Sequence, residues 1–125
     1  MSWQEYVDST LISTGTVSAA AIVGLDGNVW SASAGFTVTE KEALKLIAGF
    51  DDQTCLFGGV FAGGVYYLFL RASDDTIHGK MGEKGIVICK TAKTIIIGTY
   101  RDGMAAGNCS VTVSKLMDYL KNAGY

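Results

Sequence analysis

The side chains that could act as a nucleophile and a base are three cysteines and one histidine: Cys55, Cys89, Cys109 and His78. Cys89 falls in an alternating apolar segment, where a buried and inert thiol is the commoner outcome. Cys109 lies where a helix is expected to begin, and a helix N-terminus can lower the pKa of a thiol. A Cys–His enzyme stays an alternative, because catalytic groups assemble in space and the sequence does not exclude it.

We expect no metal, cofactor or phosphate site. The cysteines lack metal-ligand spacing, and one histidine cannot complete a zinc set. The three glycines at 79, 82 and 85 are spaced as in a phosphate-binding loop, but no Lys-Ser/Thr pair closes the pattern and a strand follows it. The acidic pairs at 51–52 and 74–75 fit solvated turns better than catalytic carboxylates. Three widely separated thiols indicate reduced cysteines in a cytoplasmic protein.

Large aromatic residues occur near both ends of the chain. Two begin it, two end it and one lies in a predicted hairpin: Trp3, Tyr6, Tyr119, Tyr125 and Trp30. Core packing is the better expectation for any single ring, but chain ends usually fray and are poor places for a core. Antiparallel terminal helices on one sheet face would bring the five rings together. Such a cluster would suit an extended proline-rich peptide, because tyrosine hydroxyls and the indole N–H can donate to its carbonyls.

The charge is unevenly spread along the chain. The first 70 residues carry two lysines and seven acidic residues, the rest carries eight Lys or Arg and five acidic residues, and the net charge is −2. Basic residues of the second half cluster in sequence at Arg71, Lys80, Lys84, Lys90, Lys93 and Arg101. A solvated sheet surface is the simplest interpretation, although a shared basic face could meet an acidic partner. Nucleic-acid binding is not expected, because stacking aromatics do not alternate with these bases.

Helices are predicted near both ends and once between them. Ser2 with Glu5 forms a capping-box pattern, which predicts a helix over 3–14 that stops at Thr14-Gly15. Thr39 with Glu42 repeats that pattern and predicts a helix ending at Gly49, with Leu44, Ile47 and Ala48 at helical spacing. The final helix should be capped by Asn108 or Ser110 and run to about residue 122. Its inner stripe is predicted to be Val113, Leu116, Met117 and Leu120, with Val111 and Lys115 facing outward.

The remaining chain reads as short strands. They are expected at 17–25, 28–33, 56–62, 65–71, 77–80, 86–90 and 94–100. Asp26-Gly27 suggests a type I′ hairpin turn, and 65–71 is typical of a well-buried strand. Short turns between the strands favour an antiparallel sheet. The sequence therefore predicts one α+β domain over 1–125, with apolar runs far too short to cross a membrane.

Several motifs in order along the chain resemble the profilin family. They are Ser2-Trp3-Gln4-x-Tyr6-Val7-Asp8, Gly24-Leu25-Asp26-Gly27-Asn28-Val29-Trp30, Ser33-Ala34-Gly35-Phe36, Ile77-x-Gly79-Lys80-x-Gly82, Lys90-Thr91, Gly98-x-Tyr100 and Lys115-Leu116-x-Asp118-Tyr119-Leu120. The resemblance covers essentially the full length and is greatest to the short profilins of amoebae, other protists and plants. The first and last motifs are the specific ones.

The resemblance implies a six- or seven-stranded antiparallel sheet, with both terminal helices on one face and the short helix on the other. It implies a cytoplasmic, cytoskeletal protein, not an enzyme, that binds monomeric actin and proline-rich segments of actin regulators. Such proteins favour nucleotide exchange on actin and deliver monomers to filament ends. Many also bind phosphatidylinositol bisphosphate, which here would rely on Lys80, Lys84 and Lys90.

The resemblance also implies two sets of site residues. The poly-proline site would be Trp3, Tyr6, Trp30, Tyr119 and Tyr125. The actin site would be Phe69, Arg71, Lys80, Lys90, Met104, Gly107, Ser110, Val111 and Lys115. Ala106 stands where many relatives have proline, which makes the loop before the last helix less rigid. The alternative function is a small α+β ligand-sensing domain with a pocket between sheet and helix.

Overall fold

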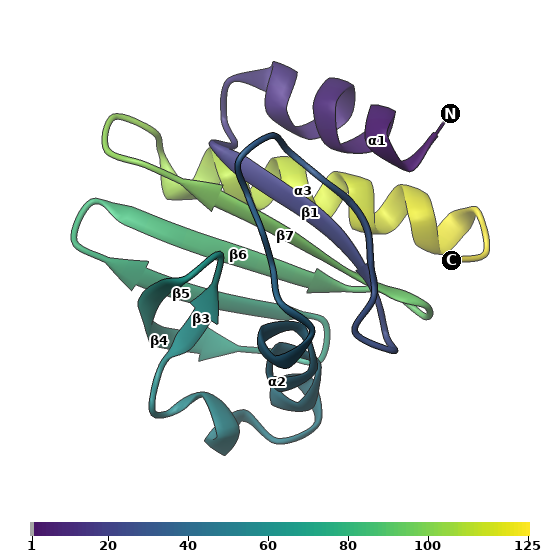
Figure 1. Ribbon diagram of the computed structural model, residues 1–125. Helices are drawn as coiled ribbons and strands as arrows, with labels where there is room; N and C mark the ends of the chain where they lie inside the picture. Colours follow the sequence, from purple (N-terminus) through teal and green to yellow (C-terminus); the bar gives the residue numbers. More distant parts are fainter. Residues whose placement is uncertain (1) are drawn as a thin grey trace.

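One seven-stranded antiparallel sheet forms the centre of the computed structural model, which describes residues 2–125 (Figure 1). The strands are β1 Ala19–Gly24, β2 Val29–Ala32, β3 Val60–Ala62, β4 Val65–Ala72, β5 Thr76–Met81, β6 Lys84–Lys90 and β7 Thr94–Tyr100. Their order across the sheet is β2-β1-β7-β6-β5-β4-β3. The first hairpin thus pairs with the last strand, which brings the two ends of the chain to the same part of the sheet.

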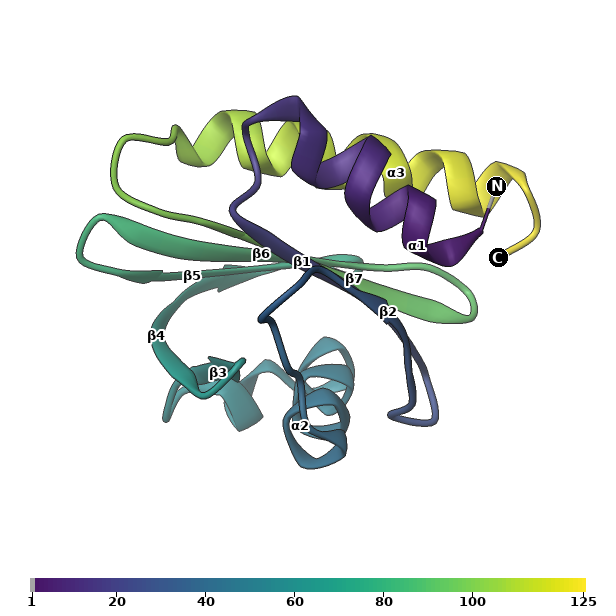
Figure 2. The ribbon, with the colours of Figure 1, turned by 45° about the horizontal axis from the view of Figure 1, so that its top comes forward.

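Helices cover both faces of this sheet (Figure 2). The N-terminal helical segment, made of α1 Trp3–Glu5, η1 Tyr6–Leu11 and η2 Ile12–Thr14, lies beside α3 Ala106–Asn122 on one face. The other face carries α2 Glu40–Asp51 and the short η3 Gln53–Leu56. This arrangement confirms the predicted α+β class and the predicted distribution of helices.

Each face of the sheet has its own apolar cluster, because alternate residues of a strand point to opposite faces. On the α3 side, Ile22 and Ile96 pack with the predicted inner stripe of α3, all of it buried. On the α2 side, Val23 and Ile97 pack with Leu46. The central strands are therefore buried on both faces, and they anchor the terminal helices.

The N-terminal helix forms as predicted but with mixed geometry. The Ser2 hydroxyl accepts from the Glu5 amide at 3.2 Å and caps it. Only the first turn is α-helical, since Tyr6–Leu11 forms wide π-type turns. Gly15 ends the segment at a φ of 75°, in the left-handed region that glycine adopts easily. Val7 and Leu11 are fully buried and fix the segment to the sheet.

Two predictions around α2 are wrong. The helix does not end at Gly49, where an added Cβ would lie 2.7 Å from the Leu56 side chain. That glycine instead allows η3 to pack closely against the last turns of α2. The buried side of α2 consists of Ala43, Leu46 and Gly49. The strand predicted over 56–62 is limited to β3, because the Asp52 carboxylate accepts from Thr54 and caps the 3-10 turn of η3.

The predictions for the start of the last helix and for the first hairpin turn are also wrong. Helix α3 begins at Ala106, and its N-cap Ala105 offers no side-chain bond, so Asn108 and Ser110 lie inside the helix. The first hairpin is not a type I′ turn, because that turn needs a positive φ at both central residues. Gly27 has a φ of 89° and donates to the Gly24 carbonyl, but every described residue with positive φ is a glycine, so Asp26 does not qualify.

The prediction that β4 is well buried is wrong. Tyr67 is 4% exposed and belongs to the α2-side cluster, whereas Leu68 is 55% exposed and Leu70 is 53% exposed. Helix α3 packs over β6 and β7 and does not extend over this strand. The same apolar sequence is therefore buried on one face and open to solvent on the other.

Candidate functional site

Five aromatic side chains meet where the two ends of the chain lie together, and we call them the aromatic cluster: Trp3, Tyr6, Trp30, Tyr119 and Tyr125. The Trp3 ring is central, with its centroid 4.8 Å from Trp30, 5.0 Å from Tyr125 and 5.5 Å from Tyr6. Tyr119 joins through Tyr6 at 5.9 Å. Trp30 and Tyr125 are each 38% exposed and Tyr119 is 55% exposed, so the rings form a surface and not a core.

Gln4 fastens the first helical turn to β2 beside the cluster. Its side-chain NH₂ donates to the Ala32 carbonyl at 2.9 Å and to the Asp8 carboxylate at 3.0 Å. Its side-chain oxygen accepts from the Ser31 hydroxyl at 2.7 Å. Because Gln4 follows Trp3 and its two β2 partners follow Trp30, these bonds fix the two indoles relative to each other.

The opposite edge of the cluster is held by Tyr125. Its carbonyl accepts from the Lys93 amide at 2.7 Å, and its own amide donates to the Leu120 carbonyl at 2.8 Å. The Lys93 ammonium lies 5.5 Å from the centre of the Tyr125 ring, which is within cation–π distance. The ring is thereby held edge-on against Trp3.

The cluster presents apolar ring faces together with hydrogen-bond donors. The neighbouring Tyr119 hydroxyl raises the pKa of Tyr6 above its ordinary value, so the Tyr6 phenol keeps its proton at neutral pH. Protonated phenols and indole N–H groups can donate to carbonyls of a bound chain while their rings contact apolar atoms. This combination fits a ligand that is both apolar and rich in exposed carbonyls.

A second surface lies on the α3 side of the sheet, and we call it the α3 surface. It comprises seven of the nine residues predicted for actin: Arg71, Lys80, Met104, Gly107, Ser110, Val111 and Lys115. Cross-strand partners share a face, and Lys80 pairs with Gly85, whose added Cβ would meet the Tyr100 ring of the α3-side cluster. Val111 is 53% exposed and Lys115 is exposed, as predicted.

The other two residues of that set lie on the opposite face. Phe69 pairs with Gly79, packs against the α2-side cluster and has its ring centroid 5.9 Å from that of Phe57. Lys90 pairs with Ile95, which belongs to the same cluster. Strand alternation thus separates Phe69 and Lys90 from the α3 surface.

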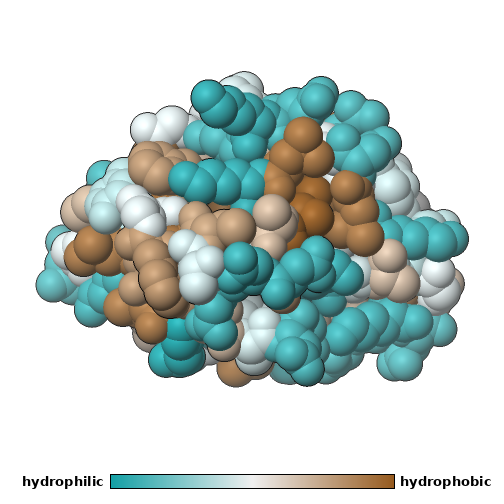
Figure 3. Space-filling model, turned by 90° about the horizontal axis from the view of Figure 1, so that it is seen from below, coloured by the Kyte–Doolittle hydropathy of each residue, from teal (hydrophilic) through white to brown (hydrophobic). Residues whose placement is uncertain are grey.

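Sequence reasoning missed an apolar neighbour of the α3 surface. Leu68 pairs with Lys80 and therefore lies on the same face of the sheet, with more than half of its side chain exposed. No sequence signal marked it, because residues 65–70 are apolar at every position and show no polar–apolar alternation. The opposite, α2-side face also carries apolar patches, which Figure 3 shows between hydrophilic ones in a view from the side of α2, β3 and β4. Among residues 2–125, Phe57 on that face is the most exposed large apolar residue, at 67%.

The cysteines do not form an activated site. Burial raises the pKa of Cys89 to about 11 and that of Cys109 to about 12, so the thiolate character that a helix N-terminus could give Cys109 is not supported. Burial and the Arg71 charge lower the pKa of His78. Within residues 2–125, no three His, Cys, Asp or Glu side chains are placed to hold a metal ion. None of the described helices is both long and apolar enough to span a membrane.

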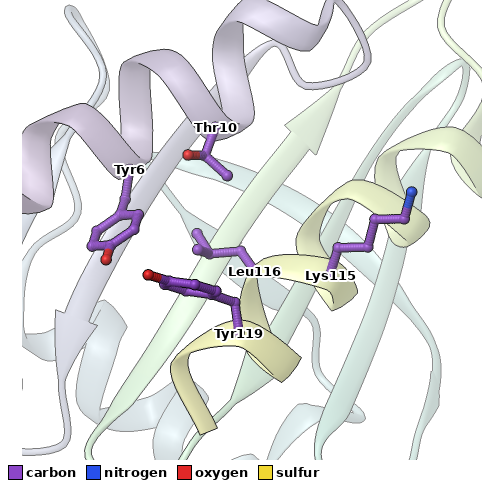
Figure 4. A pocket seen from close by; sticks show the side chains of 5 residues that line it. All are labelled: Tyr6, Thr10, Lys115, Leu116 and Tyr119. Carbon is purple, nitrogen blue, oxygen red and sulfur yellow. The ribbon is translucent and has the colours of Figure 1, made fainter. Parts of the chain in front are cut away.

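A hollow of about 270 Å³, which we call the interhelix hollow, opens between the N-terminal segment and α3 (Figure 4). It is lined by Tyr6, Thr10, Lys115, Leu116 and Tyr119. It therefore lies between the aromatic cluster and the α3 surface and shares residues with both.

A second hollow, of about 320 Å³, opens between α2 and β3 and is lined by Lys41, Glu42, Lys45 and Phe61. The Lys45 ammonium lies 5.0 Å from the centre of the Phe61 ring. Three of its four lining residues are charged, but the exposed lining is mostly apolar, since the aliphatic stems of the lysines and the Phe61 ring supply it. Its volume is at the lower end of the roughly 300–1,000 Å³ typical of small-molecule sites, so it does not by itself carry the alternative of a ligand-sensing domain.

The comparisons with known proteins point to the same family. A family model described as Profilin matches residues 1–125. Profilin-1B of Acanthamoeba castellanii and Profilin-A of Physarum polycephalum are each 44% identical over 126 residues, covering 100% of both chains. The solved structure of Acanthamoeba castellanii profilin IB superposes with a TM-score of 0.97 at 44% identity, covering 99% of this chain and 100% of that one.

A more distant solved structure includes a bound ligand. Mouse profilin IIa in complex with a double repeat from the FH1 domain of mDia1 matches with a TM-score of 0.82 at 25% identity. The match covers 100% of both chains.

Proposed function

This chain belongs to the profilin family, and from that premise we propose that it binds proline-rich segments of actin regulators on one surface and monomeric actin on another. The observation that carries the proposal is the exposed aromatic cluster, in which rings from both ends of the chain are held in fixed positions. The proposed role is that of a cytoplasmic adaptor without enzymatic activity. The raised pKa of both buried thiols gives the Cys–His alternative no support.

The aromatic cluster suits a polyproline II helix for a physical reason. That helix has no internal hydrogen bonds, so its carbonyls are free to accept from Tyr and Trp side chains, while its pyrrolidine rings pack on aromatic faces. The helix is also preformed, which lowers the entropy lost on binding. The complex of mouse profilin IIa with an FH1 double repeat supports a peptide ligand of this kind.

The α3 surface is proposed as the actin contact. It combines the cationic groups Arg71, Lys80 and Lys115 with exposed apolar side chains, Val111 and the adjacent Leu68. Cations can steer an acidic partner, and apolar groups add to affinity once water is excluded. Phe69 and Lys90 lie on the other face, so this proposal depends on them least.

Two separate surfaces allow both partners to be held at once. Tethering a monomer near a nucleator raises its effective concentration, and this is the proposed route to control of filament assembly. Support for nucleotide exchange on the bound actin is a further part of the proposal. Phosphoinositide binding has less support, because Lys80 and Lys90 lie on opposite faces of the sheet.

Trp3→Ala is expected to abolish retention on poly-proline resin, because Trp3 contacts three other rings of the aromatic cluster. Binding of monomeric actin should stay unchanged. Phe57→Ala is the control, since it removes an aromatic ring that is exposed but lies just after η3, away from the aromatic cluster. Unchanged retention of a folded Trp3→Ala variant would rule out the peptide site.

Lys115→Glu is expected to raise the dissociation constant for monomeric actin roughly tenfold, about 1.4 kcal/mol, through charge reversal against an acidic surface. The effect should shrink as salt is added, because exposed charges are screened. Lys41→Glu, on the exposed side of α2, is the control and should bind actin normally. Titration of pure monomeric actin measures both, and equal constants for both variants would contradict the assignment.

A further inference from the structure

The interhelix hollow continues the aromatic cluster toward the α3 surface. Tyr6 and Tyr119 belong to the cluster and also line the hollow, so a chain bound on the cluster can pass directly into it. We propose that the hollow is a subsite of the peptide site, taking an apolar residue and then an acidic residue that follow the prolines of the ligand. This inference rests on the proposed function and specifies which proline-rich partners the site prefers.

The walls of the hollow determine what it can accept. Leu116 is 2% exposed and forms its apolar base, with the two tyrosine rings on one side and Thr10 on the N-terminal segment. Its volume of about 270 Å³ is below the roughly 300–1,000 Å³ typical of small-molecule sites. It therefore suits one apolar side chain of a longer ligand better than an independent small molecule.

The far end of the hollow is positively charged. Figure 4 shows the Lys115 amine on the side away from the Tyr6 and Tyr119 hydroxyls, so a chain leaving the rings would run toward it. The ion pair that the described part of the chain contains joins Lys121 to Asp75 at 3.1 Å. Within residues 2–125, no carboxylate lies within 4.0 Å of the Lys115 ammonium. An acidic residue of the ligand would supply that missing partner.

The expected gain is one of selectivity. An exposed ion pair contributes about 0.2–1 kcal/mol, which corresponds to roughly a 1.5- to 5-fold change in affinity. The rings would still provide most of the binding, while the hollow would rank proline-rich segments by the residues that follow the prolines.

Lys115 also belongs to the proposed actin contact, which couples the two surfaces. A peptide whose acidic residue pairs with Lys115 competes with actin for that side chain. A peptide that ends at the tyrosine rings does not. Coupling is reciprocal, so actin should lower the affinity for the acidic peptide by the same factor that the peptide lowers the affinity for actin.

The test compares decaproline with decaproline extended by Leu-Asp or Leu-Asn at either end, titrated calorimetrically against the full chain. At one end, Leu-Asp should bind about 1.5- to 5-fold more tightly than Leu-Asn. Lys115→Gln should remove this difference, and Lys41→Gln should keep it. Saturating monomeric actin should also remove it without weakening plain decaproline.

The outcomes separate this inference from the proposed function. Binding of every peptide with no difference between Leu-Asp and Leu-Asn would overturn the subsite alone. A difference that persists in Lys115→Gln would show that the aspartate of the peptide pairs with another side chain, and this would also overturn the subsite. If no peptide binds, decaproline included, the proposed peptide site and this inference both fail.

Discussion

At the residue scale, Gln4 shows how one side chain sets the geometry of a surface that it does not itself form. Its donors and its acceptor are used in bonds to Ala32, Asp8 and Ser31. The Ser31 residue is 6% exposed, so its hydroxyl would be left unpaired if Gln4 were apolar. A buried polar group without a partner costs about 1–3 kcal/mol.

Gln4→Leu is therefore expected to destabilise the fold by about 1–3 kcal/mol and to weaken decaproline binding several-fold. It should also reduce the circular dichroism bands produced by the adjacent indoles of Trp3 and Trp30. Gln53→Leu on η3 makes the same change at an exposed position and should alter none of these quantities. Loss of stability with unchanged indole bands and unchanged peptide affinity would show that Gln4 does not position the rings.

At the element scale, the close approach of α3 to β7 depends on a glycine. A Cβ at Gly98 would lie 2.5 Å from Val113 Cγ2, and Val113 is a β-branched helical residue with little rotamer freedom. Any side chain at this position would push the helix away from the strand. Both proposed surfaces include residues of α3, so its distance from the sheet affects both.

Gly98→Ala is expected to lower the free energy of unfolding by about 1–3 kcal/mol through overpacking. Gly107→Ala is the matched control, because an added Cβ there has nothing within 4 Å. That control should raise stability by about 0.5–1 kcal/mol, since alanine is the better helix former. Urea unfolding of both variants checks the pair, and equal midpoints would contradict the packing argument.

At the scale of the whole molecule, the α3-side cluster contains two buried thiols, and this makes the stability of the fold depend on pH. The pKa of Cys89 is raised to about 11 and that of Cys109 to about 12, mainly by burial. In the unfolded chain both thiols would lose their protons near the ordinary pKa of about 8.5. Unfolding above that pH releases protons, so a rise in pH stabilises the unfolded state relative to the folded one.

The free energy of unfolding is thus expected to be independent of these thiols below about pH 8 and to fall as pH rises from about 9 to 11. Chemical unfolding at a series of pH values measures this slope. The double variant Cys89→Ala with Cys109→Ala should be less stable at neutral pH but should show a shallower alkaline slope. An identical slope would attribute the pH dependence to other groups, such as the tyrosines.

The same cluster predicts how the thiols react. Cys55 is exposed, whereas Cys89 and Cys109 are fully buried, so a thiol reagent at neutral pH should label Cys55 first. From the sequence, Cys89 was expected to be buried, whereas Cys109 was considered for a lowered pKa at a helix N-terminus. Their environments differ because only two of them point into the space between the sheet and α3.

Local patterns were sufficient for much of the fold. Ser2 and Thr39 cap helices as predicted, and Thr94–Tyr100 is a strand with the predicted bounds. The inner stripe of α3 was also predicted, because helical period and capping depend on residues only three or four positions apart. The aromatic rings were expected together on the same basis, once both terminal helices were assigned to one face.

Which groups are covered depends on how distant parts of the chain pack together. Whether Leu68 is buried depends on where α3 ends across the sheet, and whether Lys90 faces α3 depends on its pairing with Ile95. The raised pKa of Cys109 and the interhelix hollow likewise arise from packing between elements distant in sequence. Sequence periodicity fixes which side of an element is apolar, whereas burial, pKa and cavities depend on what other parts of the chain lie against that side.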